Sequence, residues 1–326
     1  MVDTPPATSA PLRVVFFGTP AFAVPSLEAL IGSVHTVAAV VSQPDRPKGR
    51  GQQLQPTPTK STAAAAGIPV LQPAKIRDES FLRQVQELRI DLGVVVAFGR
   101  ILPDALLAIP RLGMINVHAS ILPRYRGAAP IQRAVLAGDA ETGVTIMRVE
   151  TELDAGPTFA FATVPIPSDA TSGDMERVLA VLGGRALLPV VEDLAAGRAI
   201  ETPQDHARAT FAPKITKDEG TIDWNEPAGR VHDRVRGLQP WPVAWARLGP
   251  DRVAVRRTKP LPASAGVSAA ADPGTIVRAT GDELIASCGH DTHIQILELQ
   301  PEGRRTMSAR EFLAGRAIAA GSRFTS

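Results

Sequence analysis

The sequence predicts an α/β protein in which a mostly parallel, Rossmann-like sheet is followed by a smaller β-barrel. Apolar runs alternate with amphipathic stretches over the first 200 residues, a pattern typical of a parallel sheet covered by helices. Beyond residue 215, short strand-like runs separated by turn residues replace this pattern. A length of 326 residues, 44% hydrophobic and 21% charged, is sufficient for two such domains.

The first domain is expected over residues 13–200, after a disordered lead at residues 1–12. Residues 13–17 form a continuous apolar run closed by Gly18, and a helix at 25–32 follows. A dinucleotide-binding fingerprint needs three glycines at this turn, and the turn here has only Gly18, so nicotinamide binding is not expected. We expect the other strands at 37–41, 69–71, 92–98, 114–118, 144–149 and 157–165. We expect the other helices at 57–66, 81–88, 128–137 and 172–197, the last interrupted at Gly183 and Gly184.

A long basic loop interrupts this domain at residues 43–60. Its sequence, QPDRPKGRGQQLQPTPTK, is too rich in proline, glycine and glutamine to be a helix or a strand, and it predicts a long exposed loop. Arg46, Lys48, Arg50 and Lys60 outnumber the single acid, Asp45. Their charge suits phosphate contacts and suits a solvated loop equally well, so charge alone leaves both interpretations open.

The second domain is expected over residues 216–326, after a polar linker at 201–215. Short strands at 244–248, 253–258, 274–279, 284–287 and 293–299, with helices at 231–238 and 308–314, predict an OB-like barrel. After residue 208 there are 16 lysines and arginines against 13 acids, and up to it 19 against 20. This part therefore permits a nucleic-acid partner without requiring one. Five arginines favour contacts with an RNA backbone: Arg252, Arg256, Arg257, Arg304 and Arg305.

Composition and spacing argue against several classes of protein. The single cysteine, Cys288, excludes an internal disulfide framework and a cysteine zinc site, and it suits a reducing compartment. The first residues do not form a secretory signal, and no run approaches the roughly 18 apolar residues of a membrane span. The six histidines include no pair with the spacing of a helical zinc site, so no metal is expected. We expect a cytoplasmic protein that acts as a monomer.

The strongest candidate site lies between Gly113 and Pro157. Asn116 and His118 are two residues apart on the predicted strand, so an amide and an imidazole share one face. Asp154 follows the next strand on a tight loop. Because ligands bind beyond the carboxyl ends of strands in open α/β sheets, we expect the three side chains to converge there. Taken singly, each also has a structural explanation, such as a satisfied core histidine or a turn-forming aspartate.

The joint pattern resembles the folate-dependent formyltransferases. NVHASILPRYRG (116–127) followed by LDAGP (153–157) is similar to the Asn-x-His, Ser-Leu-Leu-Pro and Leu-Asp-x-Gly signature of that family. QPDRPKGRGQQLQPTP, RGAAPIQRAVLAGDAETGVTIMRVETELDAGP, IDW and LQPWPVAW extend the resemblance from Arg13 to about Phe312. These stretches look like the members of the family that act on initiator methionyl-tRNA.

The resemblance implies a reaction and a role for each site residue. The formyl group of 10-formyltetrahydrofolate would pass to the α-amino group of methionine on the initiator tRNA, without a metal. Asn116 and protonated His118 would stabilise the tetrahedral oxyanion, and Asp154 would hold the imidazole and help to move the amine proton. The folate would lie across Ser120, Ile121, Leu122 and Pro123, with the backbone of residues 99–102 beside the pterin ring.

The same resemblance implies that the basic loop meets the acceptor end of the tRNA, through Arg46, Lys48 and Arg50. Gln52 and Gln53 stand where lysines are expected, which lowers the expected charge of this contact. Ile121 replaces the usual leucine, a change of branching that the site should tolerate.

Two alternatives remain at this point. A sibling formyltransferase acting on an amino-sugar nucleotide or a purine intermediate would share the catalytic trio, but it should lack the basic loop and the barrel. A non-catalytic RNA-binding translation factor would not need the trio. The sequence also leaves open whether Arg124 and Arg126 are surface charges or phosphate contacts.

Overall fold

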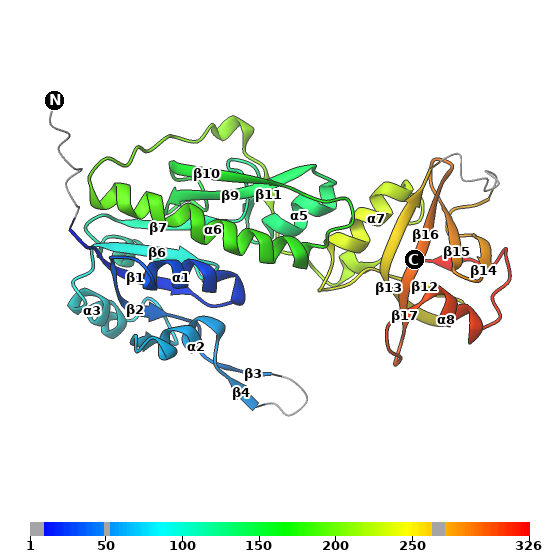
Figure 1. The fold of residues 1–326 in the computed structure, drawn as a ribbon, viewed down its shortest axis with the longest axis horizontal. Helices are drawn as coiled ribbons and strands as arrows, with labels where there is room; N and C mark the ends of the chain where they lie inside the picture. The colour runs from blue at the N-terminus through cyan, green and yellow to red at the C-terminus, as the bar shows by residue number, and fades with distance from the viewer. Residues whose placement is uncertain (1–9, 49–52, 263–270) are drawn as a thin grey trace. The chain divides into compact units, whose positions relative to one another are not determined.

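The structure is a computed structural model that describes residues 10–48, 53–262 and 271–326 (Figure 1). The described chain divides into two compact units. One unit consists of the chain up to Pro130 together with residues 142–164 and 176–212, and the other of residues 131–141, 165–175 and 213 onward. The predicted lead lies, up to residue 9, outside the described residues. The boundaries 13–200, 201–215 and 216–326 stay a prediction.

The first unit is built on a seven-stranded sheet with the order β10-β9-β7-β6-β1-β2-β5. Five of the strands run parallel: β7 (Met114–His118), β6 (Leu92–Val96), β1 (Arg13–Gly18), β2 (Thr36–Val41) and β5 (Val70–Leu71). β9 (Glu141–Arg148) runs antiparallel to β7, and β10 (Thr158–Pro165) ends the sheet. The predicted mostly parallel sheet is confirmed. β6 is buried along its whole length, which explains its uninterrupted apolar sequence.

Helices pack against this sheet. They are α1 (Val24–Ile31), α2 (Pro58–Ala65), α3 (Glu79–Glu87), α4 (Asp104–Leu107) and most of α6 (Ser172–Ala195), and Ala21–Ala23 is a 3-10 turn before α1. Thr57 caps α2, as its Oγ1 accepts a hydrogen bond from the Lys60 backbone N–H at 3.3 Å.

The expected interruption of α6 at Gly183 and Gly184 is wrong, because tertiary packing outweighs the low helix propensity of glycine. A Cβ at Gly183 would lie 2.7 Å from the Val117 side chain of β7. One at Gly184 would lie 2.8 Å from the Pro25 carbonyl oxygen of α1. The two glycines therefore let α6 approach the sheet and α1 closely.

The basic loop contains strands that the sequence did not predict. β3 (Arg46–Lys48) and β4 (Gln53–Gln55) form an antiparallel hairpin that projects from the first unit (Figure 1). A two-stranded ribbon is all edge, so Pro47 can be accommodated without a ladder bond from its nitrogen. Arg50 and Gln52 lie outside the described residues.

The base of this hairpin is fixed by side chains. Lys60 Nζ lies 2.5 Å from Asp45 Oδ2, and Gln72 Nε2 donates to Asp45 Oδ1 at 2.7 Å. The hydrogen bonds from Lys60 and Gln72 hold the pKa of Asp45 below its ordinary value.

The second unit contains a curled antiparallel sheet with the order β14-β15-β16-β13-β12-β18, and β17 pairs with β16. The strands are β12 (Trp245–Leu248), β13 (Asp251–Leu261), β14 (Ile276–Thr280), β15 (Glu283–Cys288), β16 (Thr292–Pro301), β17 (Met307–Ser308) and β18 (Phe324–Thr325). The helices are α5 (Pro130–Ala137), α7 (Ala228–Gly237), α8 (Ala309–Ala314) and the 3-10 turn Asp218–Gly220. This half-barrel agrees with the expected OB-like fold. Its core includes Trp224 stacked on Phe324, with ring centroids 5.2 Å apart.

Candidate active site

β7 presents Asn116 and His118 on one face of the first sheet. Val117, between them, points to the other face, where it meets Gly183 of α6. His118 is buried, with 5% of its surface exposed, and Asn116 is half-buried. Within the described chain the Asn116 amide has no hydrogen-bond partner. It therefore keeps two N–H groups available for a ligand.

His118 and Asp154 lie together, as the sequence predicted. His118 Nε2 lies 2.9 Å from the Tyr125 carbonyl oxygen, and Nδ1 lies 3.6 Å from Asp154 Oδ2. A carbonyl oxygen can only accept, so Nε2 carries a proton. Nδ1 is then the ring nitrogen that can gain or lose a proton, and it faces the carboxylate.

Asp154 reaches His118 by a different route from the one expected. The sequence predicts Asn116 and His118 on one strand and Asp154 after the next, all meeting beyond the carboxyl ends of these strands. However, β9 is antiparallel and its last residue, Arg148, pairs with Ile115 near the start of β7. The loop after β9 must therefore run back along β7. Its Asp154 has φ 51°, and Oδ2 accepts a hydrogen bond from the Gly127 backbone N–H at 2.8 Å.

The predicted folate segment follows β7 and is fixed by a threonine of β9. Thr145 Oγ1 donates to the Ser120 carbonyl oxygen at 2.7 Å and accepts from the Leu122 backbone N–H at 3.1 Å. Ser120 is fully buried and its hydroxyl donates to the Arg124 carbonyl oxygen at 2.6 Å, so this side chain supports the turn. Ile121, Leu122 and Pro123 are half-buried.

The segment after β6 is linked to the hairpin. Gln43 Nε2 donates to the Phe98 carbonyl oxygen at 2.7 Å, and Gln43 Oε1 accepts from Arg46 Nη2 at 3.2 Å. Beyond Gly99, Ile101 has 72% of its surface exposed. Arg46 is exposed as well.

Arg124 and Arg126, whose roles the sequence leaves undecided, have different surroundings. Arg124 is exposed, and its guanidinium lies 5.0 Å from the centroid of the Tyr125 ring. Arg126 is only 2% exposed and donates to Gln204 Oε1. Arg126 is therefore not a surface charge. The sequence offered no sign of this, because the two partners are 78 residues apart.

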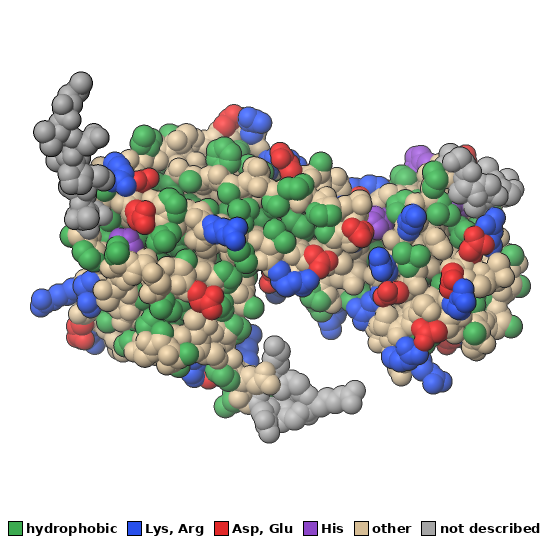
Figure 2. Space-filling view, viewed as in Figure 1, with side chains coloured by type: hydrophobic (Ala, Val, Ile, Leu, Met, Phe, Trp, Pro, Cys, Tyr) green, Lys and Arg blue, Asp and Glu red, His purple; other side chains and the backbone are tan. Residues whose placement is uncertain are grey.

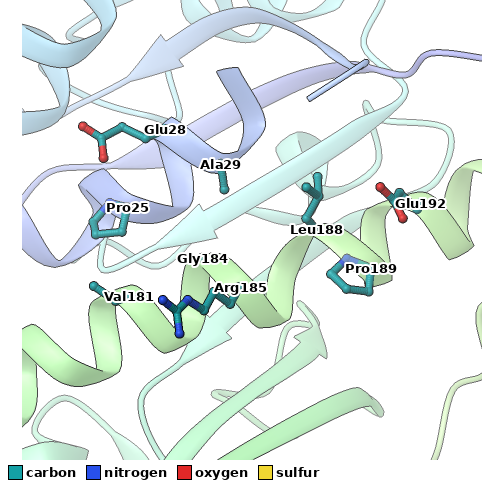
Figure 3. Close-up of a pocket in the computed structure, with 9 residues that line it drawn as sticks. All are labelled: Pro25, Glu28, Ala29, Val181, Gly184, Arg185, Leu188, Pro189 and Glu192. Atoms are coloured by element: carbon teal, nitrogen blue, oxygen red, sulfur yellow. The ribbon is translucent and has the colours of Figure 1, made fainter. Parts of the chain in front are cut away.

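A separate groove of about 560 Å³ lies between α1 and α6 (Figure 3). Pro25, Ala29 and Leu188 contribute apolar surface to it, and Glu28 and Glu192 add acidic groups. None of the predicted site residues lines this groove, so its size does not make it the candidate active site.

The arginines that we expected to contact RNA are mostly engaged within the second unit. Basic and acidic side chains are interspersed on the face of this unit shown in Figure 2. Arg252 lies over the Trp245 ring, Arg256 donates to Gln300, Arg257 lies 3.9 Å from Glu298, and Arg305 bonds Glu311 at 2.6 Å. Phosphate contacts by these four would have to compete with these partners.

In the ranges that the structure describes, no helix is long and apolar enough to cross a membrane. The same ranges hold no group of three or more histidine, cysteine, aspartate or glutamate side chains arranged to bind a metal ion.

Comparison with known proteins matches both parts of the chain. The formyl transferase family matches residues 12–191, and the formyl transferase C-terminal domain matches residues 214–317. The methionyl-tRNA formyltransferase of Moorella thermoacetica is 44% identical, over 93% of this chain and 96% of its own. That of Methylococcus capsulatus is 45% identical, over 94% and 98%.

The fold also resembles the N-formyltransferase of Helicobacter canadensis, solved with folinic acid and dTDP-3-aminofucose. The TM-score is 0.65, the identity 15%, and the match covers 87% of this chain and 98% of that one. At this identity the likeness shows the fold alone. On the full-length matches, the chain belongs to the formyl transferase family and, within it, to the methionyl-tRNA formyltransferases.

Proposed function

We propose that Asn116, His118 and Asp154 transfer the formyl group of 10-formyltetrahydrofolate to the α-amino group of methionine on initiator methionyl-tRNA. The observation that carries the proposal is the convergence of His118 and Asp154, 3.6 Å apart, on the face of β7 that also bears Asn116. The two substrates are those of the family to which the chain belongs, and this arrangement of side chains suits acyl transfer to an amine.

The first step is attack of the neutral amine on the formyl carbon. A carbon–nitrogen bond forms, and the formyl oxygen becomes an oxyanion. The Asn116 amide, which has no other hydrogen-bond partner in the described chain, donates to that oxygen in the proposed reaction. Removing one such donor typically lowers the rate about 10²-fold to 10³-fold, roughly 2.7 to 4 kcal/mol.

The second step needs a proton to leave the attacking amine and reach the folate N10 as its bond to carbon breaks. His118 Nδ1 is the ring nitrogen free to carry that proton, because Nε2 is held by the Tyr125 carbonyl oxygen. The Asp154 carboxylate stabilises the positive charge that develops on the ring. The folate is proposed to lie across Ser120 to Pro123.

The tRNA is proposed to meet the hairpin through Arg46, Lys48 and Arg50. Arg46 is exposed and linked by Gln43 to the segment after β6, so the proposed tRNA and folate contacts share one support. We also propose that the protein acts as a cytoplasmic monomer. Its single cysteine is consistent with a reducing compartment.

The test is formyl transfer from 10-formyltetrahydrofolate to methionyl initiator tRNA. We expect His118→Ala to lose most of kcat, and Arg46→Ala to raise KM for the tRNA with little change in kcat. The exposed residues His290 and Arg83 provide matched alanine controls that should retain the parent kinetics. Transfer to an amino-sugar nucleotide but to no charged tRNA would refute the proposal in favour of the sibling reaction.

A further inference from the structure

We propose that Arg126 and Gln204 are positioning residues that hold Asp154 against His118 without touching either substrate. The inference rests on the proposed function for its catalytic consequence, but its structural part can be measured without any activity. It is carried by a closed series of hydrogen bonds within the first unit.

Arg126 is a buried cation held largely by neutral groups. Its Nε and Nη2 donate to Gln204 Oε1 at 3.1 and 2.8 Å, and its Nη1 lies 3.4 Å from His206 Nδ1. A carboxylate lies further away, with Glu152 Oε1 3.7 Å from Nη1 on a side chain that is 70% exposed. Burying a guanidinium is costly unless it is hydrogen-bonded, so this arrangement needs Gln204.

Arg126 fixes the orientation of the Gln204 amide. A guanidinium has no acceptor, so the oxygen of Gln204 must face it and the NH₂ must point away. Gln204 Nε2 then donates to the Asp154 carbonyl oxygen at 2.9 Å and to the Gly156 carbonyl oxygen at 2.7 Å. One amide therefore grips the catalytic loop at two points.

The loop needs such a grip. Asp154 has φ 51°, a left-handed conformation that aspartate adopts more readily than most residues but that still costs energy relative to the ordinary backbone regions. Its carboxylate in turn accepts from the backbone N–H of Gly127, the residue after Arg126, which closes the series. Loss of the Gln204 donors would leave the Asp154 carboxylate held by that bond and by its contact with His118 Nδ1, without support from the loop backbone.

The test is Gln204→Glu. Glutamate keeps an acceptor for Arg126 and adds an ion pair, so the protein should fold, but both donors to the loop are lost and its carbonyl oxygens are repelled. We expect kcat to fall about 10-fold to 100-fold, the effect of a small misplacement of a catalytic group. KM for both substrates should stay within about twofold. Tm should fall by no more than a few degrees, because the new ion pair with Arg126 offsets part of the cost of leaving the buried Gly156 carbonyl oxygen without its donor. Gln84→Glu, on the exposed face of α3, is the matched control.

A double-mutant cycle separates positioning from general damage. In an Asp154→Asn background, Gln204→Glu should lower kcat by less than about threefold, because its effect runs through Asp154. Two independent losses that multiply would overturn the proposal, and so would an unchanged kcat in the single variant.

Hydrogen exchange provides the readout that does not depend on activity. The Gly127 amide, bonded to Asp154 Oδ2, should exchange at least about tenfold faster in Gln204→Glu than in the parent. Unchanged exchange of the Gly127 amide would refute the positioning role of Arg126 and Gln204, even if the parent protein formylates tRNA. Conversely, the parent protein could be inactive on tRNA while the Gly127 amide exchanges faster in the variant. That result would refute the proposed function and support the positioning role of Arg126 and Gln204.

Discussion

Thr145→Val tests how the predicted folate segment is held. The substitution keeps the shape of a side chain that is 1% exposed, but it removes the hydroxyl that bonds the Ser120 carbonyl oxygen and the Leu122 backbone N–H. A buried group left without its partner costs about 1 to 3 kcal/mol. The half-buried Leu122 amide can recover a bond from water, whereas the carbonyl of the fully buried Ser120 cannot. We therefore expect a net loss of about 2 kcal/mol.

The assay combines thermal unfolding with folate kinetics. A loss of about 2 kcal/mol lowers Tm by roughly 4 to 8 °C for a unit of this size. KM for 10-formyltetrahydrofolate should rise more than KM for the tRNA, because the 120–122 backbone shifts. Thr142→Val is the control, since Thr142 is 4% exposed on the same strand but does not bond this segment. Equal Tm losses in the two variants, or an unchanged KM for the folate, would refute the reasoning.

Three further predictions follow from particular contacts. Gly184→Ala should destabilise the protein by about 1 to 3 kcal/mol, because the new Cβ would lie 2.8 Å from the Pro25 carbonyl oxygen. Gly229→Ala should stabilise it slightly, because a Cβ at Gly229 would meet nothing within 4 Å. Urea unfolding measures both effects, and equal changes in the free energy of unfolding would contradict the packing argument. Burial raises the pKa of the Cys288 thiol to about 12, so an aromatic disulfide reagent at pH 8 should label it only after unfolding, and rapid native labelling would show that the core is open. Hydrogen bonds from the Ser308 backbone N–H and then from Arg305 lower the pKa of Glu311 from 4.5 to about 2. The ionised Glu311 therefore stabilises the folded protein above pH 4.5, and this stabilisation is lost as the pH falls towards 2. Glu311→Gln should flatten the fall of Tm in this range, and parallel Tm curves for the variant and the parent would contradict this role of Glu311.

Much of the fold could be predicted from hydrophobic patterning. β1 and β6 are almost wholly apolar because both of their faces are covered, and that signal is local. The direction of β9 could not be predicted in the same way. A strand–helix–strand order suggests a parallel crossover, and nothing in residues 141–148 indicates that the chain returns antiparallel beside β7. The route by which Asp154 reaches the site was misjudged for this reason.

The hairpin was missed for a different reason. Its strands, β3 and β4, are three residues each, and the prolines, glycines and glutamines of residues 43–60 are typical of loops. What fixes their base is non-local. Asp45 meets Lys60 and Gln72, 15 and 27 residues further along the chain. No pattern within residues 43–60 could have indicated Gln72 as a partner.

The residues of the candidate site also differ in how far the sequence can predict them. The types of Asn116, His118 and Asp154 are restricted by the chemistry proposed for them, so their spacing stands out in the sequence. The groups that hold them are restricted only by geometry. Gln204 needs one acceptor and one donor at the right distance, and the Tyr125 carbonyl oxygen that holds His118 could belong to any residue type.

This difference also predicts which exchanges the site should tolerate. Tyr125 contributes its backbone to His118, so Tyr125→Phe leaves that contact in place, and kcat should change little. Gln204→Asn keeps both functional groups but shortens the side chain by one methylene, so it cannot reach Arg126 and the Asp154 carbonyl oxygen together across bonds of 2.8 and 2.9 Å. Kinetics of the two variants beside the parent decide the matter. A Gln204→Asn variant with the kcat and KM of the parent would mean that Gln204 does not position the Asp154 loop.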